Sequence, residues 1–98
     1  MAFIQLIEYM TSRIDEANRL FDQWLAETQG KRATHRIVVT SDRDRPNTYI
    51  EIVEFPSYEE AMRNAELPET QAISAQIVSL CDAEPIFRNL DVVREEQP

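Results

Sequence analysis

Three residue types that often carry chemistry or mark flexible loops are nearly absent from this chain. It has one cysteine, one glycine and one histidine among 98 residues. The lone cysteine, Cys81, cannot form an internal disulfide, which is typical of a reducing compartment. A metal centre needs clustered ligands, and one histidine and one cysteine far apart do not supply them. We therefore expect no metal site, and the single glycine predicts few flexible loops.

Basic residues are also scarce. The chain has 10 Lys and Arg against 18 Asp and Glu, so its net charge is −8. Such a charge repels a phosphate backbone and an anionic membrane, and we expect neither nucleic acid nor membrane as a partner. No apolar run approaches the roughly 20 residues that span a bilayer, and the N-terminus lacks the pattern of a secretory signal. These features predict a cytoplasmic protein.

The length is that of one small domain, which we place at residues 1–94 with a polar tail at 95–98. A domain of this size buries only about 65% of the surface that its unfolded chain exposes. Pairing with a second copy would bury more, so the size alone favours an oligomer.

The stretch from Tyr49 to Glu60 is the clearest local signal in the sequence. Seven residues rich in β-branched and aromatic types predict a strand, and Pro56 then stops the ladder. Ser57 with Glu60 three positions later is typical of a capping box, which predicts that a helix begins here.

Other segments complete a βαββαβ order. Three further strands are predicted, at 3–9, 34–40 and 86–93. A helix that starts near Ser12 and ends before Gly30 is predicted between the strands at 3–9 and 34–40. Pro68 interrupts the second helical region and predicts a kinked or two-piece helix. The charged segment 41–48 reads as a solvated hairpin loop. This order predicts a ferredoxin-like α+β domain, in which a four-stranded antiparallel sheet has its helices on one face.

The alternation of side chains along the strands predicts a dimer. Alternate residues of each strand point to the same face of the sheet, and one of the two faces has more large apolar residues than a soluble monomer exposes. We therefore expect a second copy of the chain to cover that face. Polar residues of the same parity would form a network across the dimer axis. The predicted interface includes Gln5, Ile37, Glu51, Val53, Asn89 and Asp91.

Several of these segments together resemble a known superfamily. They are strand 3–9, the helix ending in Trp24-Leu25, and the run from Tyr49 to Met62 followed by an interrupted helix. This pattern is similar to the dimeric α/β-barrel superfamily, and within it to the antibiotic-biosynthesis-monooxygenase-like proteins. The resemblance implies a homodimer with two facing sheets and helices outside. It also implies a pocket between sheet and helices, in which some relatives oxidise polycyclic phenols or quinols without metal or flavin and others degrade haem.

Site residues follow from the resemblance by parity. The helix side of the sheet would be the parity that contains Leu6, Glu8, Ile52 and Glu54. The predicted ligand-binding residues are Leu6, Trp24, Ile52 and Met62, which would hold a small aromatic ligand. A cofactor-independent oxygenase needs a base and an apolar cage, and the candidate bases are Glu8, Glu54 and His35.

Haem-degrading relatives use a histidine from the second helical region. This chain has none between Ser57 and Glu84, so we expect no haem and no other cofactor.

Each candidate also has a purely structural explanation. His35 is more readily explained as a polar residue at the dimer seam or at a strand end than as a base, Trp24 and Met62 as plain core, and Cys81 as a buried, inert thiol. Three functions therefore stay open: a cofactor-independent monooxygenase, a cyclase or isomerase of polyketide-type substrates, and a non-catalytic ligand-binding or stress-associated module. An apolar pocket with a buried carboxylate would favour the enzymes. A gap filled by Trp24 and Met62 would favour the third.

Overall fold

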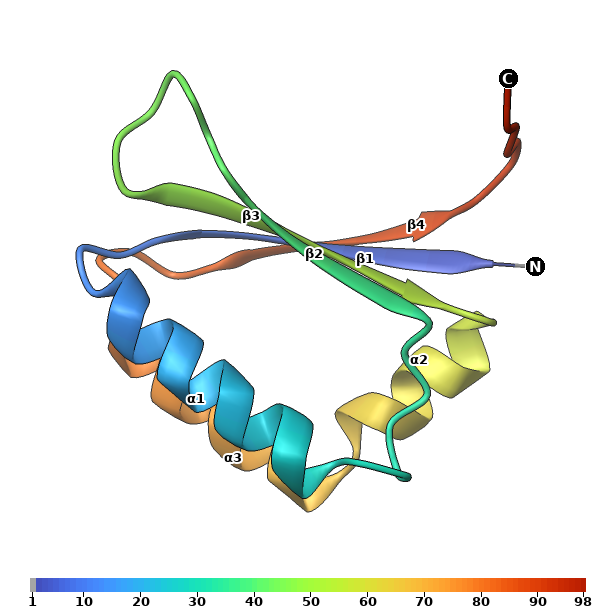
Figure 1. Cartoon of the computed structure of the whole chain (residues 1–98), viewed down its shortest axis with the longest axis horizontal. Coiled ribbons are helices and arrows are strands. Elements are labelled where there is room, and N and C mark those ends of the chain that lie inside the picture. The colour runs from blue at the N-terminus through green and yellow to red at the C-terminus, as the bar shows by residue number, and fades with distance from the viewer. Residues whose placement is uncertain (1) are drawn as a thin grey trace.

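The computed structural model describes residues 2–98 and confirms the predicted fold class. Four antiparallel strands form one sheet in the order β2-β3-β1-β4, and all the helices lie on one side of it (Figure 1). The elements, in chain order, are β1 (Phe3–Met10), α1 (Ile14–Glu27), β2 (Arg36–Ser41), β3 (Thr48–Phe55), α2 (Tyr58–Ala65), α3 (Pro68–Ser79) and β4 (Ile86–Asp91). β4 is two residues shorter than predicted, and residues 92–98 have no regular secondary structure.

Local sequence signals explain where the helices begin and end. The Ser57 hydroxyl accepts a hydrogen bond from the Glu60 N–H at 3.2 Å, so the predicted cap of α2 is confirmed. Pro68 occupies the first turn of α3, and the interrupted region is two separate helices. Gly30 has φ +82°, the left-handed conformation that ends the α1 region. The predicted start of α1 at Ser12 is wrong: Arg13 is the N-cap residue and makes no side-chain cap.

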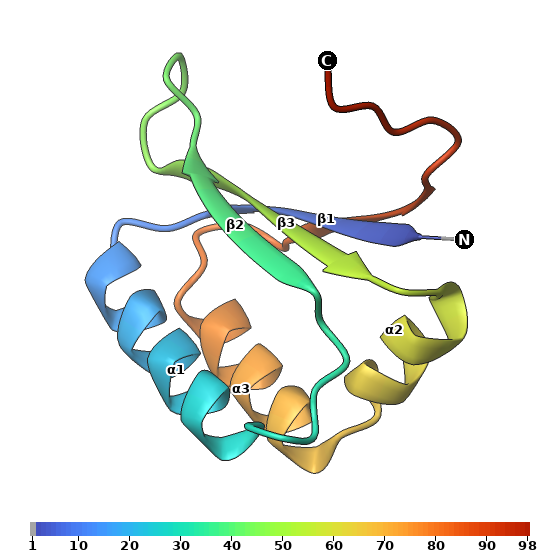
Figure 2. The same ribbon diagram turned by 45° about the vertical axis from the view of Figure 1, so that its right-hand side comes forward.

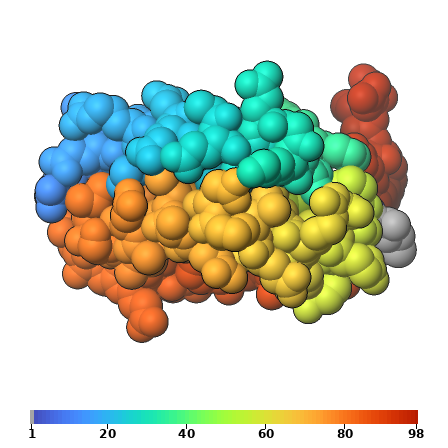
Figure 3. Space-filling model, turned by 90° about the horizontal axis from the view of Figure 1, so that it is seen from below, coloured from blue at the N-terminus to red at the C-terminus, as the bar shows by residue number. Residues whose placement is uncertain are grey.

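The helices form a continuous outer layer. α1 and α3 lie side by side along the sheet, and α2 continues the layer beneath the end of β3 (Figures 1 and 3). The Trp24 indole N–H donates to the Thr70 hydroxyl at 2.9 Å, which ties α1 to the first turn of α3. This layer leaves the opposite face of the sheet uncovered.

The face of the sheet that packs on the helices is the reverse of the predicted one. Phe3, Val53 and Phe55 are buried in a cluster with Ala61 of α2, so the parity assigned to the dimer interface faces the helices instead. Both parities are rich in apolar residues, and hydrophobicity alone therefore could not tell them apart. The aromatic side chains of β1 and β3 lie on this helix side and pack against one another in pairs.

The other side of the sheet, which we call the open face, is also apolar. In the ladder, Leu6 pairs with Ile52 and Ile52 pairs with Val38, so these three form its centre. Large hydrophobic residues of β4 add to it, with Ile86 47% and Leu90 39% exposed. No helix covers this face (Figure 2). A soluble monomer rarely exposes a contiguous apolar surface of this kind.

Candidate functional site

A cavity of about 480 Å³ lies between the sheet and the helices. Cavities of this volume commonly hold small molecules of several rings. The walls come from β1, β2, β3 and β4 above and from α1, α2 and α3 below, and they are mainly apolar and aromatic, with Ile7, Phe21, Trp24, Phe55, Ile73 and Phe87 among them. Only a few polar side chains reach it. The most consequential is Glu51.

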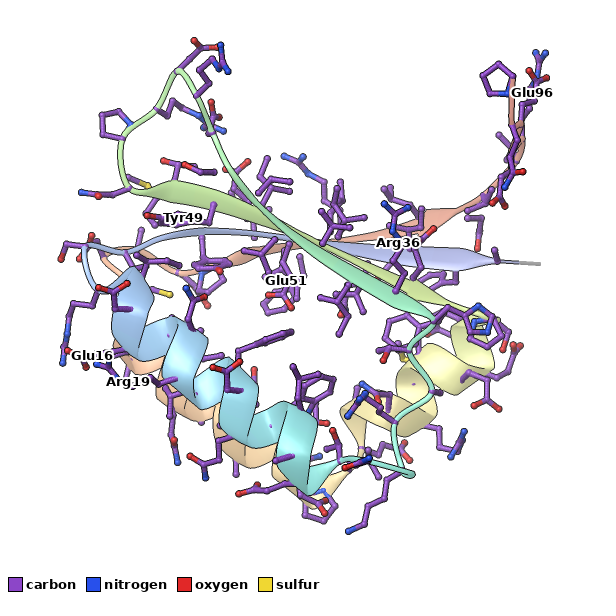
Figure 4. All side chains as sticks on the ribbon, in the orientation of Figure 1. Glu16, Arg19, Arg36, Tyr49, Glu51 and Glu96 are labelled. Atoms are coloured by element: carbon purple, nitrogen blue, oxygen red, sulfur yellow. The ribbon has the colours of Figure 1, made fainter. Side chains whose placement is uncertain are left out.

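Glu51 stands in the middle of β3 and points into the space between sheet and helices (Figure 4). Its neighbours in the ladder are Ile7 on β1 and Val39 on β2, so the carboxyl has apolar residues on both sides. Burial raises the pKa of Glu51 to about 7, and no hydrogen bond or cation within residues 2–98 opposes that effect. A carboxyl with such a pKa can both accept and release a proton near neutrality.

Two tyrosines lie beside this carboxyl. Tyr9 and Tyr49 are opposite each other in the ladder, and their rings stack with centroids 5.8 Å apart. Burial, and next the charge of Glu51, raise the pKa of Tyr9 to about 12, so its phenol stays protonated at neutral pH. Tyr9 lines the cavity and is only 7% exposed. It can therefore offer an O–H group or an aromatic surface near Glu51, and does not compete with Glu51 as a base.

Trp24 forms much of the helix-side wall. It is 5% exposed, and Phe21 lies one turn earlier with its ring centroid 5.6 Å away. The hydrogen bond to Thr70 satisfies the indole N–H and fixes the ring plane. Both predicted roles of Trp24 are thus compatible with its position, because it is a core residue that also lines the cavity.

Asn64 places a buried side-chain amide at the cavity wall. Its Oδ1 accepts a hydrogen bond from the Ala33 N–H at 3.4 Å, and the residue is 7% exposed. That bond leaves the Nδ2 group free to donate toward a ligand.

The predicted bases Glu8 and Glu54 do not reach this cavity. Both lie on the open face, where Glu8 is 3.3 Å from Arg45 and Glu54 is 3.7 Å from Arg36. The reversed parity places them there. His35 is exposed at the start of β2, on the rim of a second, smaller groove.

The reversal of the two faces also explains where most of the predicted ligand-binding and dimer-interface residues lie. Leu6 and Ile52, expected to bind ligand, lie on the open face, and Met62 packs against the core cluster. Four residues expected at the dimer interface line the cavity instead: Gln5, Ile37, Glu51 and Val53. Asn89 and Asp91 are exposed on β4, on the helix-side parity. Of the predicted ligand-binding residues, only Trp24 lines the cavity.

The described part of the chain offers no metal centre. Within residues 2–98 there is no group of three or more His, Cys, Asp or Glu side chains that could hold an ion. In the same range, no helix has both the length and the apolarity needed to cross a bilayer.

A four-stranded antiparallel sheet with its helices on one side is a ferredoxin-like α+β fold. Solved structures of antibiotic-biosynthesis-monooxygenase-like proteins have the same fold, as the sequence pattern predicted. No family model and no curated protein matches the sequence.

Several solved structures are similar to this chain in fold. One is a variant of SnoaB, a cofactor-independent oxygenase from Streptomyces nogalater, with a TM-score of 0.81 and 13% identity over 96% of this chain and 95% of that one. Another is an antibiotic biosynthesis monooxygenase, with a TM-score of 0.76 and 14% identity over 96% of this chain and 100% of the other. The structure of Rv0793 from Mycobacterium tuberculosis has a TM-score of 0.80 and 12% identity over 99% of this chain and 100% of that one. At these identities the likeness establishes the fold.

Proposed function

We propose that this protein binds a phenolic or quinol-type ring compound in the cavity and oxidises it as a cofactor-independent monooxygenase, with Glu51 as the base. The observation that carries the proposal is a partly buried carboxyl, with a pKa that desolvation raises to about 7, facing an apolar cavity of about 480 Å³. A pKa near the working pH is what a general base needs. The cofactor-independent oxygenase among the solved structures of this fold supports the same chemistry.

The reaction needs only substrate, dioxygen and the Glu51 carboxylate. Glu51 takes a proton from a ring CH₂ position activated by a neighbouring carbonyl, the keto form of a phenol. The resulting carbanion reduces dioxygen and forms a C–O bond. Protonated Glu51 then returns its proton to the peroxide, which loses water and leaves a ring carbonyl. One oxygen atom is thus in the product and the other in water, and Glu51 regains its starting state.

The apolar walls support this role. An electron-rich carbanion transfers charge to dioxygen more readily where water is excluded, and the aromatic rings of Phe21 and Trp24 exclude water from one side. The Asn64 amide and the Tyr9 O–H line different parts of the cavity, and each is a donor that a bound ligand could use.

A second candidate is a cyclase or isomerase of polyketide-type compounds. A carboxyl with a pKa near 7 can take a proton from one carbon and return it to another, without dioxygen. The two candidates share Glu51 and differ only in oxygen consumption. A non-catalytic ligand-binding module would need the cavity but not a titrating carboxyl.

We also propose a homodimer formed through the open face. Its central residues Leu6, Val38 and Ile52 would pack against the same residues of a second copy, on the order of 800 Å² per partner. This is the opposite face from the one that the sequence pattern predicted. The predicted cytoplasmic location remains a proposal that rests on composition.

Dithranol, a dihydroxyanthrone with an activated ring CH₂, is a suitable test substrate. Wild-type protein is expected to consume one dioxygen per anthraquinone formed, above the uncatalysed rate, and Glu51→Gln to lower that rate by 10²-fold or more. Glu54→Gln, three residues along β3 on the open face, is the matched control and should keep full activity. Equal rates for wild type and Glu51→Gln would contradict the proposal. Loss of substrate without oxygen uptake would favour the isomerase.

A further inference from the structure

A second groove of about 300 Å³ opens beside the cavity, between α1 and the start of the edge strand β2. It shares Phe21 and Ile37 with the cavity, so the two spaces are adjacent. Its character is different, because the cationic and polar residues Arg32, Thr34, His35 and Arg36 line it. The chain as a whole carries a net charge of −8, which makes this gathering of basic groups unusual for the molecule.

Arg32 is the central group of the groove. Its Nη1 donates to the Leu25 carbonyl at 2.7 Å and to the Thr28 hydroxyl at 3.3 Å, which fixes the partly buried guanidinium at the end of α1. The guanidinium carbon also lies 5.8 Å from the centre of the Trp24 ring. Neither Nε nor Nη2 donates a hydrogen bond to residues 2–98, and no carboxylate of that range lies within 4.0 Å.

The other basic groups differ in how available they are. Arg36 borders the groove, but its side chain points to the open face, where Glu54 is 3.7 Å away and partly compensates its charge (Figure 4). The His35 side chain is exposed on the groove rim. Arg32 is therefore the cation that is both positioned by the fold and free to bind an anion. A guanidinium with free N–H groups on Nε and Nη2 suits the oxygen atoms of a carboxylate, sulfonate or phosphate.

We propose that the groove binds an acidic group of the same molecule whose ring body occupies the cavity. The ligand class is thus an apolar ring system that carries one anionic substituent, held by Arg32 with help from the His35 side chain. Trp24 connects the two spaces, since its ring lines the cavity and contacts the Arg32 guanidinium. An anion anchored on Arg32 would fix how the rings lie relative to Glu51. This inference rests on the proposed function for the ring-binding half of the site.

Two fluorescent probes test it, because they share one ring system. N-phenyl-1-naphthylamine is neutral, and 8-anilinonaphthalene-1-sulfonate adds a sulfonate. Trp24 is the only tryptophan; it lines the cavity and lies 5.8 Å from the guanidinium carbon of Arg32 in the groove, so its quenching reports binding at this site. We expect the sulfonate to bind wild type more tightly than the neutral probe. Arg32→Gln should weaken sulfonate binding roughly 10- to 100-fold and leave the neutral probe unchanged.

Arg43→Gln, in the exposed β2–β3 loop, removes the same charge elsewhere and should change neither affinity. Arg32 also closes the end of α1, so a misfolded variant is possible; wild-type protein in 0.5 M NaCl then gives the independent measurement, in which only sulfonate binding should weaken. Equal affinities for the two probes, insensitive to salt, would overturn the anion site and leave the cavity proposal standing. Failure of both probes to quench Trp24 would overturn both.

Discussion

Glu51 and Ile52 are consecutive residues of β3 that lie on opposite faces of the sheet. Glu51 lines the cavity under the helices, and Ile52 lies at the centre of the open face between Leu6 and Val38. One strand therefore supplies both the proposed base and the centre of the proposed dimer contact. A change at either position should affect one property and not the other.

The first prediction concerns the pH dependence of oxidation. Glu51 acts as a base only when deprotonated, and burial raises its pKa to about 7. The rate of dithranol oxidation, corrected for the uncatalysed reaction, should therefore rise with pH and reach half its maximum near pH 7. A rate with a midpoint near pH 4.5, the ordinary range of a glutamate, would rule out a buried Glu51 as the base.

The second prediction concerns stability. The folded pKa of Glu51 exceeds its unfolded value, so the protonated form is favoured in the native state. That contribution is fully present below about pH 4.5 and is lost as pH rises through 7, amounting to about 3 kcal/mol. Glu51→Gln should remove the dependence and make the protein more stable than wild type at pH 8. Urea unfolding at pH 5 and pH 8 measures this, and parallel pH profiles for the two proteins would contradict it.

The third prediction concerns assembly. Ile52→Lys places a charge at the centre of the open face and should convert a dimer to a monomer or an aggregate. Val39→Lys is the control, because Val39 lies on an edge strand on the other face and is already 42% exposed. Native mass spectrometry of the three proteins gives the masses. An Ile52→Lys variant that stays dimeric would remove the open face from the interface.

The fourth prediction concerns the bond between α1 and α3. Thr70→Val leaves the indole N–H of Trp24 buried without a partner and should cost about 1–3 kcal/mol of stability. Adding Trp24→Phe removes the N–H, so the double variant should be less destabilised than the sum of the single variants. Strict additivity in thermal or urea unfolding would show that the hydrogen bond contributes nothing.

The fold could be predicted because local signals agreed with it. The strand pattern ending at Pro56, the Ser57 cap and the single Gly30 each set an element boundary, and the boundaries together gave the topology. Pro68 similarly predicted the break between α2 and α3.

The site could not be predicted to the same degree, because both faces of the central strands are apolar. β3 carries a glutamate on each face, Glu51 and Glu54, and β1 carries Gln5 on one and Glu8 on the other. Alternation therefore gave the two sets of residues correctly but not which set the helices cover. Only the packing of Phe3, Val53 and Phe55 on α2 decides that, and it depends on contacts between distant segments.

The most direct measurement is a ¹³C NMR titration of the glutamate side-chain carboxyls in wild type and Glu51→Gln. We expect one carboxyl resonance of the wild type to titrate near pH 7, to be absent from the variant, and to shift when N-phenyl-1-naphthylamine is added. If every glutamate titrates between about pH 4 and 5 and none responds to the probe, Glu51 is not a buried carboxyl in a ligand cavity, and the proposed function fails with it.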